Sequence, residues 1–473
     1  MTFTSFPFLS LFLPFSLFLV ILAGRRFANA ALLLASLLFY ALNDLQGLPV
    51  LIVSILWNYG VGSVVCHQGD RQRRMLTLGA GIGGNLLLLG FFKYTVFTLD
   101  QLGLVLPLIA QKGLLNGMHQ PLGISFFTFQ AISYLVDLYR NTISFDRNLT
   151  RFALYLAIYP HLFAGPIIRY GDIAGQLLRR HLTAEVFASG LRRFMQGLGK
   201  KMLLANLFAS VVDRIFALPA DQLNQATAWL GALLYSLQIY YDFSGYTDMA
   251  IGIGRLFGFQ FPENFNDPYA ASSIRDFWRR WHITLSSWFR DYLFIPLGGS
   301  RCNATRTHLN LVLVFVLCGL WHGANWTFLA WGGLHGVCMV AERLGLERLL
   351  ARGSRLLTHS YVLVVLMVSW VLFRAKNLPE ALSYLRSMFW PANGTLQSAY
   401  PPAFFMTSEL GVAIFFGIMM SFPWWRAILP VTTSGRTARG LAWAADIALL
   451  LVLFAGMMEI AAGGHHPFIY LQF

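Results

Sequence analysis

Long apolar runs recur along almost the whole chain and are separated by short polar segments. A helix of about 20 apolar residues crosses the ~30 Å hydrocarbon layer of a membrane. Several runs are shorter or contain glycine and proline, which membrane proteins tolerate where protein or a water-filled cavity surrounds the backbone. We therefore expect an all-α, polytopic membrane protein of roughly ten to twelve transmembrane or re-entrant helices in a single domain over residues 1–473. The predicted segments are Phe6–Ala23, Ala30–Leu42, Pro49–Val65, Met75–Phe92, Val96–Ala110, Pro121–Tyr139, Phe152–Ile168, Met202–Leu218, Trp229–Phe257, Leu309–Val340, Tyr361–Phe373, Phe404–Phe422 and Leu441–Ala461.

The composition excludes a soluble globular chain. Of the 473 residues, 56% are hydrophobic and only 12% are charged, whereas soluble domains carry about 25% charged residues. A globule of this size cannot hide so much apolar surface from water, so lipid must cover part of it. The cysteines form no CxxC pair, and the neighbouring histidines His465 and His466 have no further ligands at suitable spacing. No metal site is therefore predicted.

The basic residues gather in short clusters between the apolar runs. The formal net charge is +14, from 35 lysines and arginines against 21 acidic residues. In a soluble protein this excess would suggest nucleic acid, but clusters between apolar runs are typical of cytoplasmic loops. We therefore expect contacts with membrane lipid and no nucleic-acid partner. The clusters are Arg25–Arg26, Arg71–Arg74, Arg179–Arg180, Arg192–Arg193 with Lys200–Lys201, and Arg343–Arg355.

The segment Phe261–Gly299 is too polar to span lipid and holds the first candidate chemistry. Ser273 and Asp276 have the spacing of a capping box, so an amphipathic or re-entrant helix is predicted over residues 273–295. Aromatic residues, Trp278 among them, form one face of that helix. A neighbouring face carries arginines, and a histidine lies at the boundary between the faces. These residues are Arg275, Arg279, Arg290 and His282.

Two interpretations of this helix remain open. An interfacial helix would place its tryptophans among lipid headgroups and its arginines on lipid phosphates. Alternatively, the arginines hold the phosphates of an activated donor whose reactive end is directed inward, because guanidinium groups bind phosphate oxygens in a forked geometry. On the second interpretation, Arg275, Arg279 and Arg290 are donor-binding residues.

A histidine in the apolar run Leu309–Val340 is the second candidate. If the run is one helix, His322 lies about 20 Å along it. An ionisable group in mid-membrane is a functional-site hypothesis by default, and burial disfavours its charged imidazolium form. A neutral His322 can accept a proton during catalysis, or it can donate one structural hydrogen bond between helices. His335, on another face, is expected to pack.

The polar stretch Tyr240–Asp248 is the third candidate. Carboxylates in an apolar segment need partners, and Arg255 or Arg275 are the predicted ones. Asp242 and Ser244 lack the GxSxG pattern of a serine hydrolase. We therefore expect this stretch to brace the site.

Three motifs resemble, in order and spacing, those of the membrane-bound O-acyltransferase family. The similarity is to the bacterial branch that includes alginate O-acetyltransferase and the D-alanyl transfer protein of teichoic acid synthesis. The motifs are DFSGYTDMAIGIGRLFGFQFPENFNDPY, SSIRDFWRRWHITLSSWFRDYLFIPLGG and GLWHGANWTFLAWGGLHG. Weaker similarity covers nearly the full chain. The resemblance implies a multi-helix membrane enzyme with a central tunnel, and we place its catalytic core at residues 229–340.

The resemblance also implies particular site residues and substrates. His322, the histidine of the WHG motif, would be essential to O-acyl transfer, and His282, of the RRWH motif, would be the second polar residue of the site. Acetyl-CoA would be the donor, on the cytoplasmic side of a bacterial inner membrane. A separate extracytoplasmic acetyltransferase or esterase-like partner would esterify the polysaccharide, and a polysaccharide synthase or secretion complex is a further expected partner. The residues expected to shape the site are Trp321, Asn325, Asp242, Ser244 and Trp278.

The expected function is O-acetylation of an exported polysaccharide, with alginate ranked first as acceptor, cellulose second and peptidoglycan third. The alternative from another class is a membrane transporter or channel subunit of a polysaccharide secretion complex, without acyltransferase chemistry. Mid-membrane histidines and interrupted spans serve transporters equally well.

Overall fold

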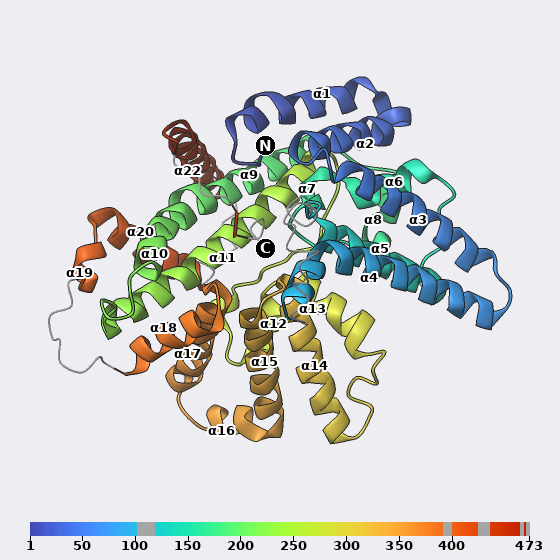
Figure 1. Ribbon diagram of the computed structural model, residues 1–473. Helices are drawn as coiled ribbons and strands as arrows, with labels where there is room; N and C mark the ends of the chain where they lie inside the picture. The colour runs from blue at the N-terminus through green and yellow to red at the C-terminus, as the bar shows by residue number, and fades with distance from the viewer. Residues whose placement is uncertain (102–118, 391–399, 424–435, 464–467, 470–473) are drawn as a thin grey trace. The chain divides into compact units, whose positions relative to one another are not determined.

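The chain folds into helices throughout its described part (Figure 1). The computed structural model describes residues 1–101, 119–390, 400–423, 436–463 and 468–469, so most of the predicted segment Val96–Ala110 and the pair His465–His466 lie outside the described residues. Six described helices are long and apolar enough to cross a membrane, which confirms a polytopic all-α membrane protein. The predicted count of ten to twelve is not confirmed. The six spans are Gly24–Asn43, Leu48–His67, Arg71–Leu99, Ala304–His322, Arg355–Arg374 and Gly440–Ala461.

The described chain forms two compact units. The first comprises residues 1–194 and 249–262, and the second comprises residues 195–248 and 263–473. The single domain over residues 1–473 and the catalytic core at 229–340 stay predictions.

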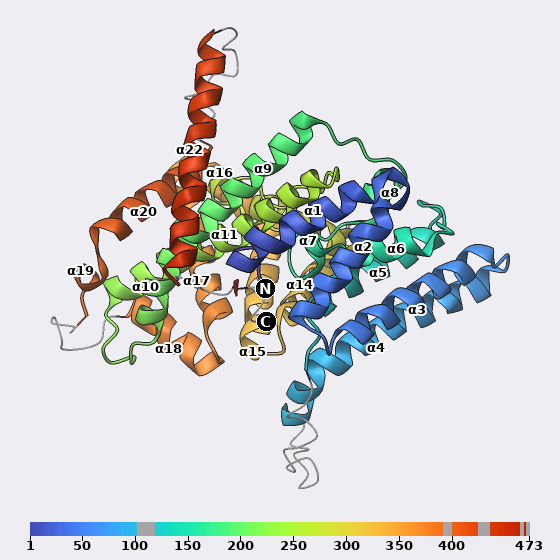
Figure 2. The same ribbon diagram turned by 90° about the horizontal axis from the view of Figure 1, so that it is seen from above.

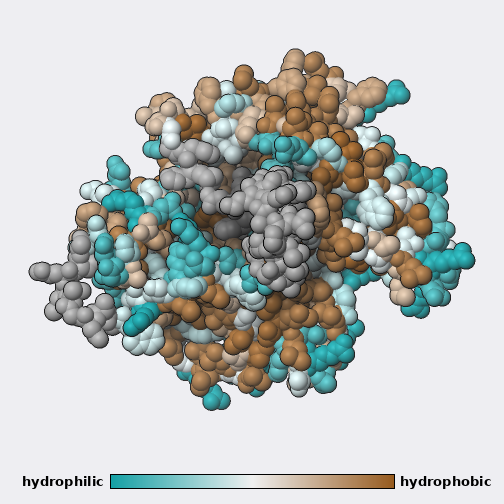
Figure 3. Space-filling view, in the orientation of Figure 1, coloured by the Kyte–Doolittle hydropathy of each residue, from teal (hydrophilic) through white to brown (hydrophobic). Residues whose placement is uncertain are grey.

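The first unit is built around the helix pair α3 (Leu48–His67) and α4 (Arg71–Gln101), which run side by side (Figure 2). Asn58 and Asn85 join the two helices through reciprocal side-chain hydrogen bonds of 3.1 and 2.7 Å. Hydrophilic residues gather at the tip of the pair, at the right of Figure 3. An apolar pair with a polar tip is suited to cross lipid. The unit also holds η1 (Phe8–Phe12), α1 (Leu13–Leu22), α2 (Gly24–Asn43), α5 (Ile124–Tyr139), α6 (Leu149–Ala157), α7 (Tyr159–Leu162), α8 (Tyr170–Leu178) and most of α9 (Ala184–Gly199).

The second unit holds the remaining helices, and α15 is a common neighbour of α12, α14 and α17. Two of these helices, α12 and α14, carry half of the candidate site residues. The elements are η2 (Lys200–Ala205), α10 (Asn206–Phe216), α11 (Gln225–Leu256, whose last turns belong to the first unit), η3 (Pro268–Ala270), α12 (Ile274–Arg280), α13 (Ile283–Phe289), η4 (Arg290–Phe294), α14 (Ala304–His322), α15 (Trp326–Ala341), η5 (Glu342–Leu346), α16 (Glu347–Ala351), α17 (Arg355–Arg374), α18 (Leu378–Phe389), α19 (Pro402–Phe405), α20 (Ser408–Met420) and α22 (Arg436–Ala461).

The predicted run Leu309–Val340 is two helices rather than one. Helix α14 ends at His322, the chain turns, and α15 returns antiparallel to it. Asn325 caps α15, because its Oδ1 accepts the backbone N–H of Thr327 at 3.1 Å. His322 therefore lies at the end of a helix, which corrects the mid-span position predicted from one continuous helix.

Glycines allow α14 and α15 to approach until their backbones touch. A Cβ atom on Gly319 would lie 2.1 Å from the carbonyl oxygen of Phe328, and one on Gly332 would lie 2.2 Å from that of Phe315. Both distances are far below van der Waals contact with carbonyl groups that cannot rotate away. Close backbone approach through small residues is a common way to pack membrane helices. This contact fixes His322 against the residues of α15.

We expect Gly332→Ala to destabilise the protein. The added methyl must separate α14 from α15, and overpacking of this kind lowers the free energy of unfolding by about 1–3 kcal/mol. Thermal unfolding of the purified protein in detergent measures the change. Gly333→Ala is the matched control, because a Cβ atom there meets nothing within 4 Å. Equal stability of the two variants would contradict the tight contact.

Candidate functional site

His322 is buried among aromatic rings where α14, α15 and α17 meet. Its side chain is only 4% exposed. The ring centroids of Trp321, Trp331 and Phe373 lie 4.9, 5.2 and 5.3 Å from the imidazole centroid. The imidazole therefore lies against protein rather than lipid. Burial against protein is what is expected of a functional histidine in a membrane protein.

The helix predicted over residues 273–295 begins where expected but is broken. Ser273 accepts the N–H of Asp276 at 3.0 Å, as a helix cap does, and α12 begins at Ile274. After α12, His282 has a φ of +43°, a left-handed conformation that residues other than glycine seldom adopt. The prediction of one continuous helix is therefore wrong. Strained backbone of this kind is concentrated at functional sites.

The backbone break holds His282 in a fixed orientation. The Nδ1 of His282 lies 3.1 Å from Oδ1 of Asn264, and that oxygen also accepts from the backbone and hydroxyl of Thr284. Because Asn264 Oδ1 is the acceptor, His282 Nδ1 carries the proton and donates. His282 lies outside the six candidate spans, and burial lowers its pKa to about 3. The imidazole is therefore neutral near pH 7, with its lone pair on Nε2.

One indole contacts both candidate histidines. The ring centroid of Trp321 lies 6.4 Å from that of His282 and 4.9 Å from that of His322. Asn325 stabilises the adjoining turn, because its Nδ2 donates to the carbonyl of Lys376 at 2.7 Å. The structure thus brings four predicted site residues together around the indole of Trp321. They are His282, Trp321, His322 and Asn325.

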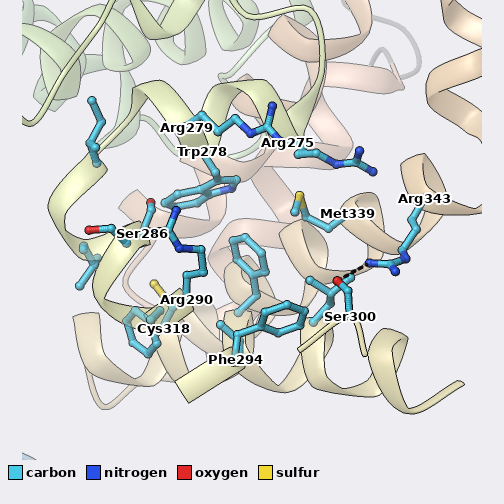
Figure 4. Close-up of a pocket in the computed structure, with 17 residues that line it drawn as sticks. Arg275, Trp278, Arg279, Ser286, Arg290, Phe294, Ser300, Cys318, Met339 and Arg343 are labelled. Carbon is cyan, nitrogen blue, oxygen red and sulfur yellow. Dashed lines mark hydrogen bonds between the residues drawn. The ribbon is translucent and has the colours of Figure 1, made fainter. Parts of the chain in front are cut away.

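The predicted donor-binding arginines line one pocket in the second unit (Figure 4). The cavity has a volume of about 670 Å³ and is bordered by α12, α13, η4, α14 and the start of η5. In Figure 4, Arg275 and Arg279 lie along one edge with Trp278, and Arg343 approaches Ser300 from the side. None of the described residues that line the pocket is acidic. The four arginines that line it are Arg275, Arg279, Arg290 and Arg343.

Two of the four arginines have carboxylate partners outside the pocket lining. They are Arg275, with Glu347 at 3.2 Å, and Arg290, with Asp291 at 2.7 Å. Within the described ranges, Arg279 and Arg343 have no ion-pair partner, and Arg343 donates to the Ser300 hydroxyl at 3.3 Å. The guanidinium groups of Arg279 and Arg343 are therefore available for an anionic ligand.

The pocket approaches His322 without including it. Cys318 lines the pocket four residues before His322 on α14, which is a separation of about 6 Å along the helix axis. Trp278 also lines the pocket, and its ring packs 5.7 Å from that of Trp331, which contacts His322. Neither His282 nor His322 is among the lining residues. An aromatic wall thus separates the arginines from His322.

The polar stretch of α11 holds two buried carboxylates, and each pairs with a lysine: Asp248 with Lys200 at 2.7 Å, and Asp242 with Lys201. Asp242 Oδ1 lies 2.5 Å from Nζ of Lys201, and both side chains are almost completely buried. Asp242 Oδ2 accepts the backbone N–H of Ile469 at 2.7 Å. The arginine partner predicted for Asp242 is therefore wrong. Ser244, on the same helix, is 1% exposed.

Glu342 is a residue of the site region that sequence reasoning missed. Its carboxylate accepts the N–H groups of Ile274 and Arg275 at 2.6 and 3.0 Å and so holds the first turn of α12. Burial raises the pKa of Glu342, and the two N–H groups partly offset that rise. The sequence holds only a weak indication that Glu342 accepts these hydrogen bonds. The first N–H groups of a helix need acceptors, but a glutamate 67 residues away cannot be recognised as one.

Comparisons with known proteins show which family and which proteins this sequence is similar to. Residues 125–352 match the model of the membrane-bound O-acyltransferase family, MBOAT. The chain is 41% identical to the probable alginate O-acetylase AlgI of Pseudomonas putida, with 100% of both chains covered. It is 39% identical to the peptidoglycan O-acetyltransferase of Helicobacter pylori, over 76% of this chain and 74% of that protein. It is 29% identical to the teichoic acid D-alanyltransferase of Streptococcus thermophilus, over 54% and 65%.

A relative of this identity over the full length of both chains shows the family directly. The matched residues include the segment that carries His282, His322 and the arginine pocket. Together with the apolar helices, these findings lead to one conclusion: the chain belongs to the membrane-bound O-acyltransferase family and is a multi-pass membrane O-acyltransferase.

Proposed function

We propose that this chain is an O-acetyltransferase of the bacterial inner membrane. It takes acetyl groups from acetyl-CoA at the cytoplasmic face and passes them across the membrane for O-acetylation of an exported polysaccharide. The observation that supports this proposal is the arginine pocket, which combines four guanidinium groups with an apolar lining that includes Phe294 and Phe315. Coenzyme A has phosphates at one end of a flexible arm and its thioester at the other. Arginines suit the phosphates, and the apolar lining suits the arm.

The proposed chemistry is a direct acyl transfer assisted by His322. The acceptor hydroxyl oxygen attacks the thioester carbonyl while His322 takes the hydroxyl proton. The new C–O bond forms, the C–S bond breaks, and the proton passes from His322 to the leaving thiolate. The products are an acetyl ester and the free thiol of coenzyme A. His282, which contacts Trp321 as His322 does, orients the thioester.

The acceptor ranked first is alginate. Proteins named probable alginate O-acetylase are similar to this chain over its full length, in Pseudomonas putida and in Azotobacter vinelandii. Cellulose is ranked second and peptidoglycan third, and the relative from Helicobacter pylori supports peptidoglycan. Because the polymer lies outside the cytoplasm, the proposed partners are an extracytoplasmic acetyltransferase or esterase-like protein and a polysaccharide synthase or secretion complex.

Deletion of the gene for this chain tests the proposal in the producing bacterium. Ester-linked acetyl per sugar and the total mass of exported polysaccharide are measured together. We expect acetyl ester to disappear while the polymer is still exported. A large fall in the mass of exported polymer with unchanged acetyl per sugar in what remains would contradict the proposal and would favour the transporter or channel alternative. Complementation with the intact gene is the control.

Arg279→Ala should weaken the use of the acetyl donor. Arg279 lines the pocket and has no ion-pair partner in the described ranges, so its loss removes a charge-assisted hydrogen bond to a donor phosphate. The loss of such a bond should raise the KM for acetyl-CoA about tenfold or more. Acetyl transfer by membrane vesicles at varied acetyl-CoA concentration measures it. Arg306→Ala is the control, because Arg306 is exposed on α14 outside the pocket. An unchanged KM in Arg279→Ala would remove this arginine from the donor site.

A further inference from the structure

Trp331 lies at the junction between the arginine pocket and His322. Its side chain is 1% exposed. Its ring centroid lies 5.2 Å from His322 on one side and 5.7 Å from Trp278, a pocket-lining residue, on the other. The rings of His335, Phe373 and Trp370 also surround it, at 5.1, 5.3 and 6.3 Å. Trp331 therefore contacts both a pocket-lining residue and His322.

The indole N–H of Trp331 has no acceptor among the residues that the structure describes. An indole nitrogen can only donate, and a buried tryptophan normally finds an acceptor for it. Phenylalanine would fill such an aromatic cluster without leaving a buried donor unmet. An unsatisfied buried polar group calls for an explanation, and a catalytic role is one such explanation.

The neighbouring histidine does not satisfy this donor. The Nδ1 of His335 accepts the indole N–H of Trp278 at 3.2 Å, so this lone pair is already used and the proton of a neutral His335 is on Nε2. His335 Nε2 also lacks a hydrogen-bond partner within the described ranges. Trp331 and His335 therefore each carry an N–H group without an acceptor in the described ranges, and neither side chain has a free acceptor atom. An acceptor supplied by the substrate would complete the arrangement.

We propose that the indole N–H of Trp331 donates a hydrogen bond to the carbonyl oxygen of the acyl group during transfer at His322. The inference rests on the proposed acetyl transfer. As the acceptor oxygen attacks, the carbonyl oxygen gains negative charge, and the C–O bond forms before the C–S bond breaks. An N–H that donates to that oxygen stabilises the charge, and the hydrogen bond weakens again when the carbonyl re-forms in the acetyl ester.

Replacement of Trp331 by an isosteric residue without the N–H tests the assignment. Benzothienylalanine keeps the shape of the indole but has sulfur in place of the N–H group, and Trp331→Phe is the simpler companion variant. We expect both to lower kcat for acetyl transfer by about a hundredfold to a thousandfold. The KM for acetyl-CoA should stay unchanged, since the bond strengthens only in the transition state. Trp288→Phe is the control for the loss of a buried indole, because Trp288 lies outside the pocket lining.

The outcomes separate this inference from the function on which it rests. If the benzothienylalanine protein retains the kcat of the unmodified protein, the N–H is not the donor, whatever the Phe variant does. If only Trp331→Phe loses activity, the ring acts by packing and the proposal is overturned. If the unmodified protein transfers no acetyl group, both the inference and the proposed function fail together. A loss of kcat in both variants with unchanged thermal stability supports the assignment.

Discussion

Replacement of His322 by alanine should abolish acetyl transfer while the protein still folds and inserts into the membrane. General base catalysis contributes about 10²–10⁴-fold to a rate, and the alanine variant has no other group at this position to accept the hydroxyl proton. The measurements are the initial rate of acetyl transfer in membrane vesicles and the ester-linked acetyl on the exported polymer. Normal acetylation by this variant would exclude His322 as the base.

A second variant is needed because the imidazole is also part of an aromatic cluster. Removal of the ring leaves a gap between Trp331 and Phe373 and can lower stability on its own. His322→Gln retains much of the volume and the hydrogen-bonding capacity but cannot act as a base near pH 7. It should be as inactive as the alanine variant and should melt closer to the unmodified protein. His308→Ala, near the start of the same helix, is the matched control and should keep full activity.

The sequence predicted local features of the site better than its three-dimensional connections. The start of α12 at Ile274 followed from the Ser273 cap, and the shared face of Arg275 and Arg279 followed from helical periodicity. The same periodicity could not predict the break at His282, because a left-handed residue other than glycine carries no composition signal. Helices are normally interrupted at glycine or proline, and neither residue occurs next to His282.

The turn between α14 and α15 was missed for a different reason. Only three residues, Gly323–Asn325, separate the two apolar stretches, so an average over a span-length window gives almost the same profile for one long span and for two packed helices. The distinction depends on Gly319 and Gly332, which let the two backbones touch. Close packing of this kind is a relation between distant residues, and a one-dimensional profile does not contain it.

The buried ion pair of Asp242 and Lys201 is the clearest example of such a relation between distant residues. Asp242→Ala should lower the free energy of unfolding by about 3–5 kcal/mol, because it leaves the buried ammonium of Lys201 without its carboxylate. The variant also removes the acceptor for the backbone N–H of Ile469. Unfolding of the purified protein in detergent, by heat or denaturant, measures the change. Glu459→Ala is the control, because Glu459 is an exposed acid.

A double variant separates the ion pair from a general loss of packing. Lys201→Met keeps most of the lysine volume without the charge, so it should restore much of the stability that Asp242→Ala loses. If the charge is the cause, the double variant is more stable than Asp242→Ala alone. If the two changes simply add, the energetic role of the pair is disproved and the loss belongs to the Ile469 contact. Recovery of folding with no recovery of acetyl transfer would further show that the pair braces the site in addition to stabilising the fold.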